Sequence, residues 1–80
     1  MKKKNTIVMP KLSPSMKDAV LVAWNKEINE EVRKGDVLFE VETDKVVCEI
    51  EATADGVLEQ KFFDEGDHIR VGETVAELID

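Results

Sequence analysis

The sequence predicts an all-β fold: a small flattened β-barrel or sandwich of two antiparallel sheets, with an internal pseudo-two-fold repeat and no substantial helix. Two halves of the chain align at a shift of 37 residues, and short β-branched runs are separated by Gly, Asn or Pro. A third observation is the alternation of apolar and charged residues on either side of a turn within residues 37–52. Eighty residues form one domain with a single modest core, because a chain this short hides only about 60% of its unfolded surface.

The chain is predicted to begin with a flexible basic segment over residues 1–6, and the folded domain is predicted to span residues 7–80. Lys2, Lys3, Lys4 and Asn5 are all polar, so they are expected to be solvated. Each half of the domain then repeats one series: a strand, a polar turn, a short extended piece, a glycine turn and another strand. The paired positions are residues 20–24 and 57–62, Asn29 and Gly66, Val32 and Ile69, and Gly35 and Gly72. Asn29 stands where the other half has glycine, which predicts a turn with positive φ.

Residues 37–52 are predicted to form a hairpin about a two-residue turn, Asp44-Lys45. In this register Thr43 faces Val46, and the pairs Val41–Cys48, Phe39–Ile50 and Val37–Ala52 form an apolar face. The opposite face carries Glu42–Val47, Glu40–Glu49 and Leu38–Glu51 and is expected to be in water. A slip of one residue would bury the glutamates, so the register is strongly specified. The turn lacks the glycine that such hairpins favour, and a broken local rule of this kind indicates a functional position.

The repeat also predicts where Lys45 points. Adding 37 to residues 44–45 gives a position just beyond the C-terminal end of the chain, and subtracting 37 gives Ile7 and Val8. The chain ends therefore take the place of a second tip, and a pseudo-two-fold axis would put them at the opposite end of the domain from Lys45. That arrangement suits a tethered carrier.

Charge and cysteine content exclude several classes. Residues 1–17 carry five lysines and no acid, whereas residues 18–80 carry eighteen acids and six bases, so nucleic acid is not an expected partner. Cys48 is the single cysteine; its place on the apolar face predicts a small buried hydrophobe, and it can form neither an internal disulfide nor a zinc site. A reducing compartment follows, the bacterial cytoplasm or the mitochondrial matrix of a eukaryote. No membrane partner is expected, because no apolar run approaches about 20 residues.

One segment, Glu42-Thr43-Asp44-Lys45-Val46, resembles the lipoylation site of the lipoyl domains of 2-oxo acid dehydrogenase complexes. Further similar segments follow the same order and spacing: residues 9–16 (MPKLSPSM), 22–24 (VAW), 32–36 (VRKGD), 54–57 (ADGV) and 65–67 (EGD). The chain departs from the usual pattern at Ala19, Asn29 and Thr53, all in expected turns. The opening loop is similar to the pyruvate or acetoin type of acyltransferase component, whereas Asp18-Ala19 and residues 44–47 are similar to the 2-oxoglutarate type.

The resemblance implies a non-catalytic carrier with lipoate joined to the ε-amino group of Lys45 by an amide. The implied partners are the thiamine-dependent 2-oxo acid dehydrogenase component, the acyltransferase core that loads coenzyme A, and dihydrolipoyl dehydrogenase. A lipoate ligase or a lipoyl/octanoyl transferase would attach the cofactor, and the domain itself would be monomeric. The chemistry belongs to the cofactor, while the domain supplies display and a high effective concentration.

The residues expected to be recognised beside the lysine are Glu42, Asp44, Val46, Leu12, Ser13 and Pro14. No metal site is expected, because His68 has no second ligand of a suitable type and the acids of residues 64–67 lack calcium-site spacing. Two alternatives stay open: a biotin carrier domain, which characteristically flanks its lysine with methionines, and an unmodified interaction module that uses its acidic surface. An autonomous enzyme is not expected, since no nucleophile–base pair or phosphate-binding loop is present.

Overall fold

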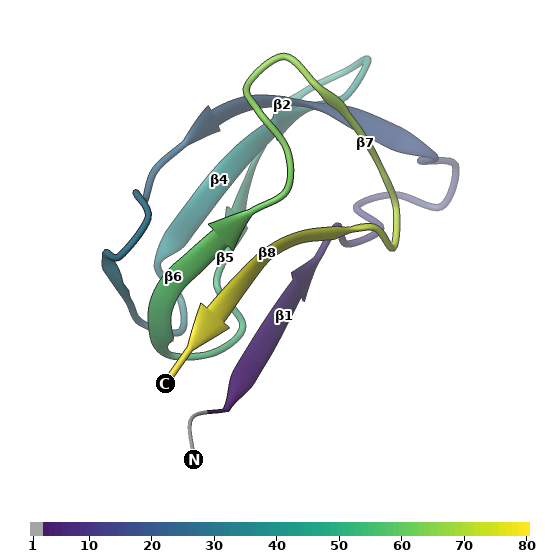
Figure 1. Ribbon diagram of the computed structural model, residues 1–80. Helices are drawn as coiled ribbons and strands as arrows, with labels where there is room; N and C mark the ends of the chain where they lie inside the picture. The colour runs from purple at the N-terminus through teal and green to yellow at the C-terminus, as the bar shows by residue number, and fades with distance from the viewer. Residues whose placement is uncertain (1–2) are drawn as a thin grey trace.

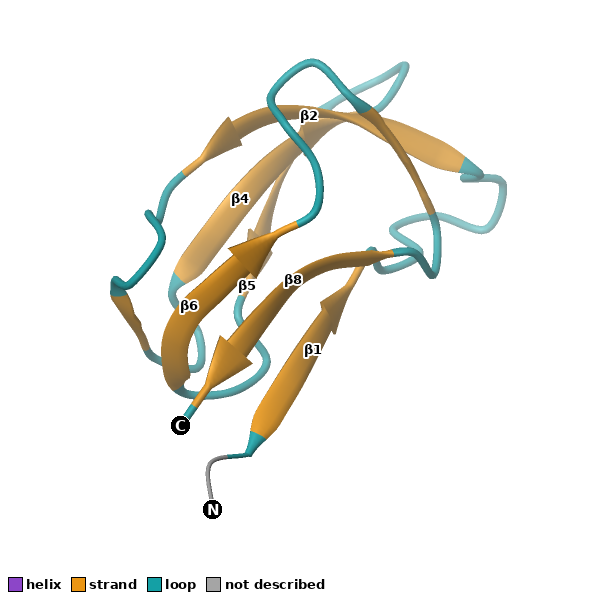
Figure 2. Cartoon of the chain, in the orientation of Figure 1, coloured by secondary structure: helices purple, strands orange, loops and turns teal. Residues whose placement is uncertain are grey.

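The computed structural model describes residues 3–80, which form eight β-strands and no helix (Figure 2). The strands are β1 (Lys4–Val8), β2 (Asp18–Trp24), β3 (Glu31–Val32), β4 (Val37–Glu42), β5 (Val47–Glu51), β6 (Gly56–Lys61), β7 (His68–Arg70) and β8 (Thr74–Ile79). The predicted all-β class is confirmed. The predicted repeat of strand, short extended piece and strand is also confirmed, because β2, β3 and β4 are followed by β6, β7 and β8 in matching positions.

The strands form two four-stranded antiparallel sheets, ordered β1-β8-β6-β3 and β5-β4-β2-β7 (Figure 1). The repeat matches β8, β6 and β3 with β4, β2 and β7. Replacing each strand of the first sheet by its match, and β1 by β5, gives the order of the second sheet, which is the predicted pseudo-two-fold relation. Apolar side chains from both sheets fill the space between them. The buried core consists of Ile7, Met9, Ala19, Leu21, Val32, Leu38, Phe39, Val41, Ile50, Ala52, Leu58, Ile69, Val75, Ala76 and Leu78.

The turns between strands have the backbone geometry that the repeat predicts. Asn29 has φ of 74° and Gly66, its counterpart, has φ of 99°. Gly35 and Gly72 are likewise matched, at 97° and 90°. Asn29 is the only non-glycine residue with positive φ between residues 3 and 80, as expected for a side chain that tolerates the left-handed region better than most.

The hairpin register is confirmed near the tip and wrong at its base. Phe39 pairs with Ile50 and Glu40 with Glu49 as predicted, but Val37 pairs with Glu51, because Leu38 is an extra residue in a β-bulge. The predicted solvent position of Leu38 is therefore wrong, and its side chain is 0% exposed. The pairing of β8 with β1 skips Val75 in the same way, and Val75 is the repeat partner of Leu38.

The N-terminal boundary also needs correction. Residues 1–2 of the predicted flexible segment lie outside the described residues, but Lys4, Asn5 and Thr6 belong to β1 and pair with β8. The Lys4 Nζ lies 3.5 Å from a carboxylate oxygen of Glu59 and 3.7 Å from one of Glu77. Strand pairing at the sheet edge satisfies the backbone here, and the acids of β6 and β8 accommodate the basic side chain.

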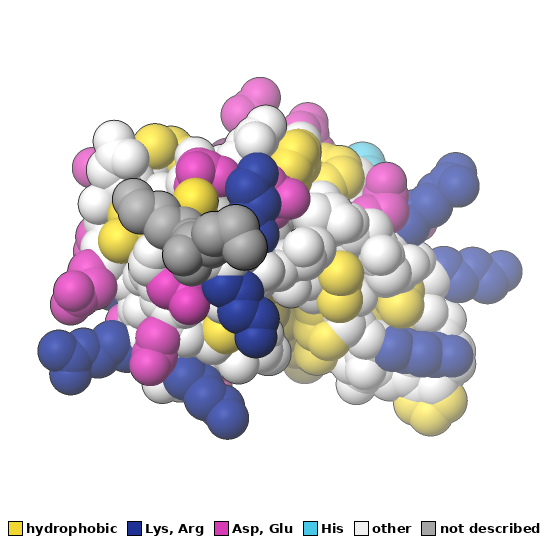
Figure 3. All heavy atoms as spheres, turned by 60° about the horizontal axis from the view of Figure 1, so that its bottom comes forward, with side chains coloured by type: hydrophobic (Ala, Val, Ile, Leu, Met, Phe, Trp, Pro, Cys, Tyr) yellow, Lys and Arg dark blue, Asp and Glu magenta, His cyan; other side chains and the backbone are white. Residues whose placement is uncertain are grey.

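The β4–β5 hairpin tip and the chain termini lie at opposite ends of the domain, which measures 40 × 20 × 20 Å along its principal axes (Figure 1). The two ends of the described chain are adjacent because β1 pairs with β8 from Lys4–Ile79 onward, and the Asp80 N–H donates to the Lys3 carbonyl at 3.1 Å. The end that carries the termini presents acidic and basic side chains mixed together rather than one patch of a single sign (Figure 3).

Candidate functional site

The tip of the β4–β5 hairpin presents Asp44, Lys45 and Val46 to solvent, with Val46 56% exposed. Thr43 and Val46 close the turn, and the Thr43 N–H donates to the Val46 carbonyl at 2.9 Å. Neither Asp44 nor Lys45 has positive φ, so the turn is not one of the primed types that hairpins favour. The missing glycine was thus a sound signal of unusual turn geometry.

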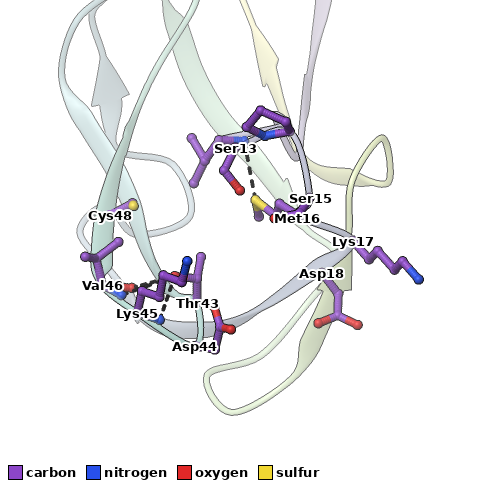
Figure 4. Close-up of a pocket in the computed structure, with 12 residues that line it drawn as sticks. Ser13, Ser15, Met16, Lys17, Asp18, Thr43, Asp44, Lys45, Val46 and Cys48 are labelled. Carbon is purple, nitrogen blue, oxygen red and sulfur yellow. Dashed lines mark hydrogen bonds between the residues drawn. The ribbon is translucent and has the colours of Figure 1, made fainter.

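A hollow of about 690 Å³ lies between this hairpin and the loop that joins β1 to β2; we refer to it as the tip hollow (Figure 4). Its lining combines five apolar or weakly polar side chains with seven polar ones. The lining residues are Leu12, Ser13, Pro14, Ser15, Met16, Lys17, Asp18, Thr43, Asp44, Lys45, Val46 and Cys48. Two segments that are about 30 residues apart in sequence therefore meet beside Lys45.

Met16 fixes the loop at this place. It packs against the buried core, its N–H donates to the Ser13 carbonyl at 3.2 Å, and its sulfur accepts the Leu12 N–H at 3.3 Å. These contacts anchor a loop that otherwise has no strand pairing. Leu12, 39% exposed, is held at the rim of the tip hollow as a result.

The structure brings most of the predicted recognition residues together. Leu12, Ser13, Pro14, Asp44 and Val46 all line the tip hollow with Lys45. The exception is Glu42, which is exposed and lies outside the hollow. Strand alternation turns its side chain to the outer face of its sheet.

Two side chains at the site differ from expectation or were missed. Cys48 is half-buried and not fully buried: it packs against the core, yet it also lines the tip hollow (Figure 4). The β1–β2 loop does not cover this part of the hairpin completely, which alternation along β5 could not reveal. Thr43 was not singled out, although a hydroxyl beside a turn without glycine is a sequence signal for a side-chain-stabilised turn.

Three other lysines, Lys4, Lys26 and Lys61, contact neighbouring acidic or aromatic groups. The Lys61 Nζ lies 4.8 Å from the centroid of the Trp24 ring, a cation–π contact. The Lys26 Nζ lies 3.3 Å from a carboxylate oxygen of Asp36 and 3.5 Å from one of Glu30. Among the residues that the structure describes, Lys45 forms no ion pair, and the same is true of Lys11, Lys17 and Lys34.

Lys26, Glu30 and Asp36 form a cluster of charged side chains, remote from the tip, in which each group shifts the pKa of its neighbours. A hydrogen bond with Asp36 raises the pKa of Lys26. The pKa of Asp36 is lowered by the backbone N–H of Arg33 and then by Lys26, and the pKa of Glu30 is lowered first by the backbone N–H of Glu27. This cluster links the β2–β3 loop to the β3–β4 turn and serves the fold.

Within residues 3–80, no three His, Cys, Asp or Glu side chains are grouped as a metal site would require. The same residues include no helix long and apolar enough to cross a membrane.

Comparison with known proteins decides the family. The sequence model of the family described as "Biotin-requiring enzyme" (Biotin_lipoyl) matches residues 5–78. The solution structure of the lipoyl domain of the 2-oxoglutarate dehydrogenase complex from Azotobacter vinelandii superposes with a TM-score of 0.75 and 35% identity, covering 94% of this chain and 95% of that one. The chain belongs to the lipoyl-domain family. The predicted family and carrier class are confirmed, and a biotin carrier is the less favoured alternative.

The curated relatives of this lipoyl domain come from two kinds of complex. The chain is 41% identical over 76 residues to the pyruvate dehydrogenase complex protein X component of Saccharomyces cerevisiae, covering 94% of this chain and 18% of that protein. It is 45% identical over 60 residues to the dihydrolipoyllysine-residue succinyltransferase component of the Escherichia coli 2-oxoglutarate dehydrogenase complex, covering 75% and 15% respectively. The lipoyl domain therefore spans less than a fifth of the length of these relatives.

Proposed function

We propose that Lys45 carries lipoate as an amide on its ε-amino nitrogen and that the domain acts as a swinging-arm acyl carrier in a 2-oxo acid dehydrogenase complex. When attached, the lipoyl group supplies a dithiolane that carries acyl groups as thioesters and is afterwards reoxidised. The domain would receive acyl groups at a thiamine-dependent dehydrogenase component and present them to the acyltransferase core, where coenzyme A accepts them. A dihydrolipoyl dehydrogenase would complete the cycle.

The observation that carries this proposal is the place of Lys45 in a lipoyl domain: an exposed residue at a hairpin tip, at the end of the molecule opposite both termini. Polypeptide continuing from either terminus would leave the domain far from this lysine. A tether attached there leaves Lys45 free to visit several partners while raising its local concentration near each.

The residues beside Lys45 fit a lipoyl group. Leu12, Met16, Val46 and Cys48 offer apolar or weakly polar surface in the tip hollow, suited to an aliphatic chain and a dithiolane ring. Amide formation also removes the positive charge of Lys45, so the acylated side chain would lose less solvation on contact with that surface than the free ammonium would.

We propose that the surface around the tip hollow is what the partner enzymes recognise. Residues 12–14, Asp44 and Val46 surround the attachment point, and Glu42 would add a contact for the lipoylating enzyme on the outer face. Since relatives from pyruvate and 2-oxoglutarate complexes both match, the proposal extends to 2-oxo acid dehydrogenases as a class, in the bacterial cytoplasm or the mitochondrial matrix.

The test of attachment is the intact mass of the chain after incubation with lipoate, ATP and a lipoate ligase. One lipoyl group should be added to the wild type and none to Lys45→Arg, with Lys17→Arg as the matched control because Lys17 lines the same hollow. A parallel reaction with biotin, ATP and a biotin ligase distinguishes the alternative carrier. Modification by biotin alone would overturn the proposal.

The carrier role needs a second experiment. The lipoylated domain would be mixed with a thiamine-dependent pyruvate or 2-oxoglutarate dehydrogenase component and the matching 2-oxo acid, and the acyl adduct would be followed by mass. Acylation should be much faster than that of free lipoamide at equal concentration. Equal rates would mean that the protein surface contributes no recognition.

A further inference from the structure

The hairpin tip has a conformational problem that its backbone does not solve. The two-residue loops that match strand twist need positive φ, and Asp44 and Lys45 both lack it. The Thr43 N–H donates to the Val46 carbonyl at 2.9 Å, but the N–H of Val46 does not return the bond to a backbone carbonyl. A solvent-exposed turn held by one backbone bond would sample several conformations.

The side chain of Thr43 supplies the missing contacts. Its hydroxyl oxygen accepts the N–H groups of Lys45 and Val46, both at 3.2 Å, and the hydroxyl donates to the Val46 carbonyl at 3.2 Å. A hydroxyl has one donor and two acceptor positions, so the whole capacity of Thr43 is used within the turn. The two accepted bonds fall in the usual range for N–H···O, while the donated bond is long for O–H···O, so the accepted bonds contribute most.

From these contacts we infer that Thr43 is a positioning residue for modification: its hydroxyl holds the backbone of Lys45 in the one arrangement that a lipoylating enzyme reads. This inference rests on the proposed function. One of the two bonds is made directly to the amide of Lys45, and the other to the next residue. The hydroxyl therefore fixes both peptide groups that flank the lysine side chain.

The rest of the hairpin does not depend on this hydroxyl. Phe39–Ile50 and Val41–Cys48 set the register further along the strands, and the side chains of Phe39, Val41 and Ile50 are in the core. Loss of the hydroxyl would leave the fold intact and free the tip alone. When only a fraction of molecules has a competent tip, the apparent affinity of the enzyme falls by that fraction, whereas the rate once bound does not change.

The experiment compares Thr43→Val, which keeps the β-branched shape without the hydroxyl, and Thr43→Ser, which keeps the hydroxyl. Thr53→Val is the matched control, since Thr53 is exposed in another turn. Lipoylation by lipoate ligase with lipoate and ATP is measured at varied protein concentration. Thr43→Val should raise KM about tenfold, equivalent to about 1.4 kcal/mol, at unchanged kcat. Thr43→Ser and Thr53→Val should stay within about twofold of the wild type.

A readout without modification accompanies the kinetics. Amide hydrogen exchange at Lys45 and Val46 should accelerate in unmodified Thr43→Val and not in Thr43→Ser, while the melting temperatures of both stay near that of the wild type. Unchanged KM and exchange in Thr43→Val, or an equal defect in Thr43→Ser, would overturn the inference. A wild type that accepts no lipoate would instead refute the proposed function, and the exchange data would still decide whether the hydroxyl orders the tip.

Discussion

Replacing Leu38 with alanine tests the bulge in β4. Simple strand alternation would place this side chain in solvent, whereas the bulge places it in the core. Leu38 is 0% exposed, and truncation of a fully buried leucine costs about 2–5 kcal/mol, including the cavity left behind. At roughly 0.05–0.15 kcal/mol per residue, a domain of this length has about 4–12 kcal/mol of stability. A loss of about 3 kcal/mol would lower the melting temperature by roughly 12–24 °C.

Urea and thermal unfolding, followed by circular dichroism, measure this loss directly. Leu12→Ala is the matched control, because it makes the same chemical change at a side chain that is 39% exposed at the rim of the tip hollow. The control should lose less than about 1 kcal/mol. Equal, small losses in the two variants would mean that Leu38 faces solvent and that the bulge is wrong.

Three other substitutions probe the stability of the fold. Gly56→Ala should cost about 1–3 kcal/mol in urea unfolding, because a Cβ there would lie 2.9 Å from a backbone oxygen of β8 at a φ of 156°. Glu49→Lys should raise stability by about 0.2–1 kcal/mol by replacing a like-charge pair with the glutamate opposite it on β4, and high salt should shrink the gain. Asp36 has a lowered pKa, so its stabilising contribution is present above its usual value of 3.8 and is lost as pH falls through the folded-state pKa. The melting temperatures of wild type and Lys26→Met should therefore differ at neutral pH and converge under acid, and a constant difference would exclude this coupling.

Much of the fold could be predicted from the sequence because its signals are periodic and repeated. Alternation in residues 37–52 gave the pairing of Phe39 with Ile50, and the 37-residue repeat gave the turn at Asn29 and its positive φ. The bulge at Leu38 was not predicted, because each residue of one strand was paired with only one residue of the other. The consecutive apolar residues at Val75 and Ala76, in the matching place of the other half, were the available signal.

The site was predictable in part. The position of Lys45 at the hairpin tip follows from the strand pattern. The tip hollow depends on where the β1–β2 loop lies, and Met16 anchors that loop through core packing and a hydrogen bond accepted by its sulfur. The half-burial of Cys48 follows from the same loop position. The hydroxyl of Thr43 beside a turn without glycine was a signal that its side chain stabilises the turn. The residue pattern does not show that it accepts the N–H groups of both Lys45 and Val46.

We propose that Lys45 alone carries the lipoyl group, and peptide-level mass spectrometry of the chain after reaction with lipoate, ATP and lipoate ligase tests this most directly. The adduct should be found on the peptide that contains Lys45, and Lys45→Arg should abolish it while the melting temperature stays the same. A lipoyl group on any other lysine, or its persistence in Lys45→Arg, would contradict the assignment of Lys45 as the single attachment site.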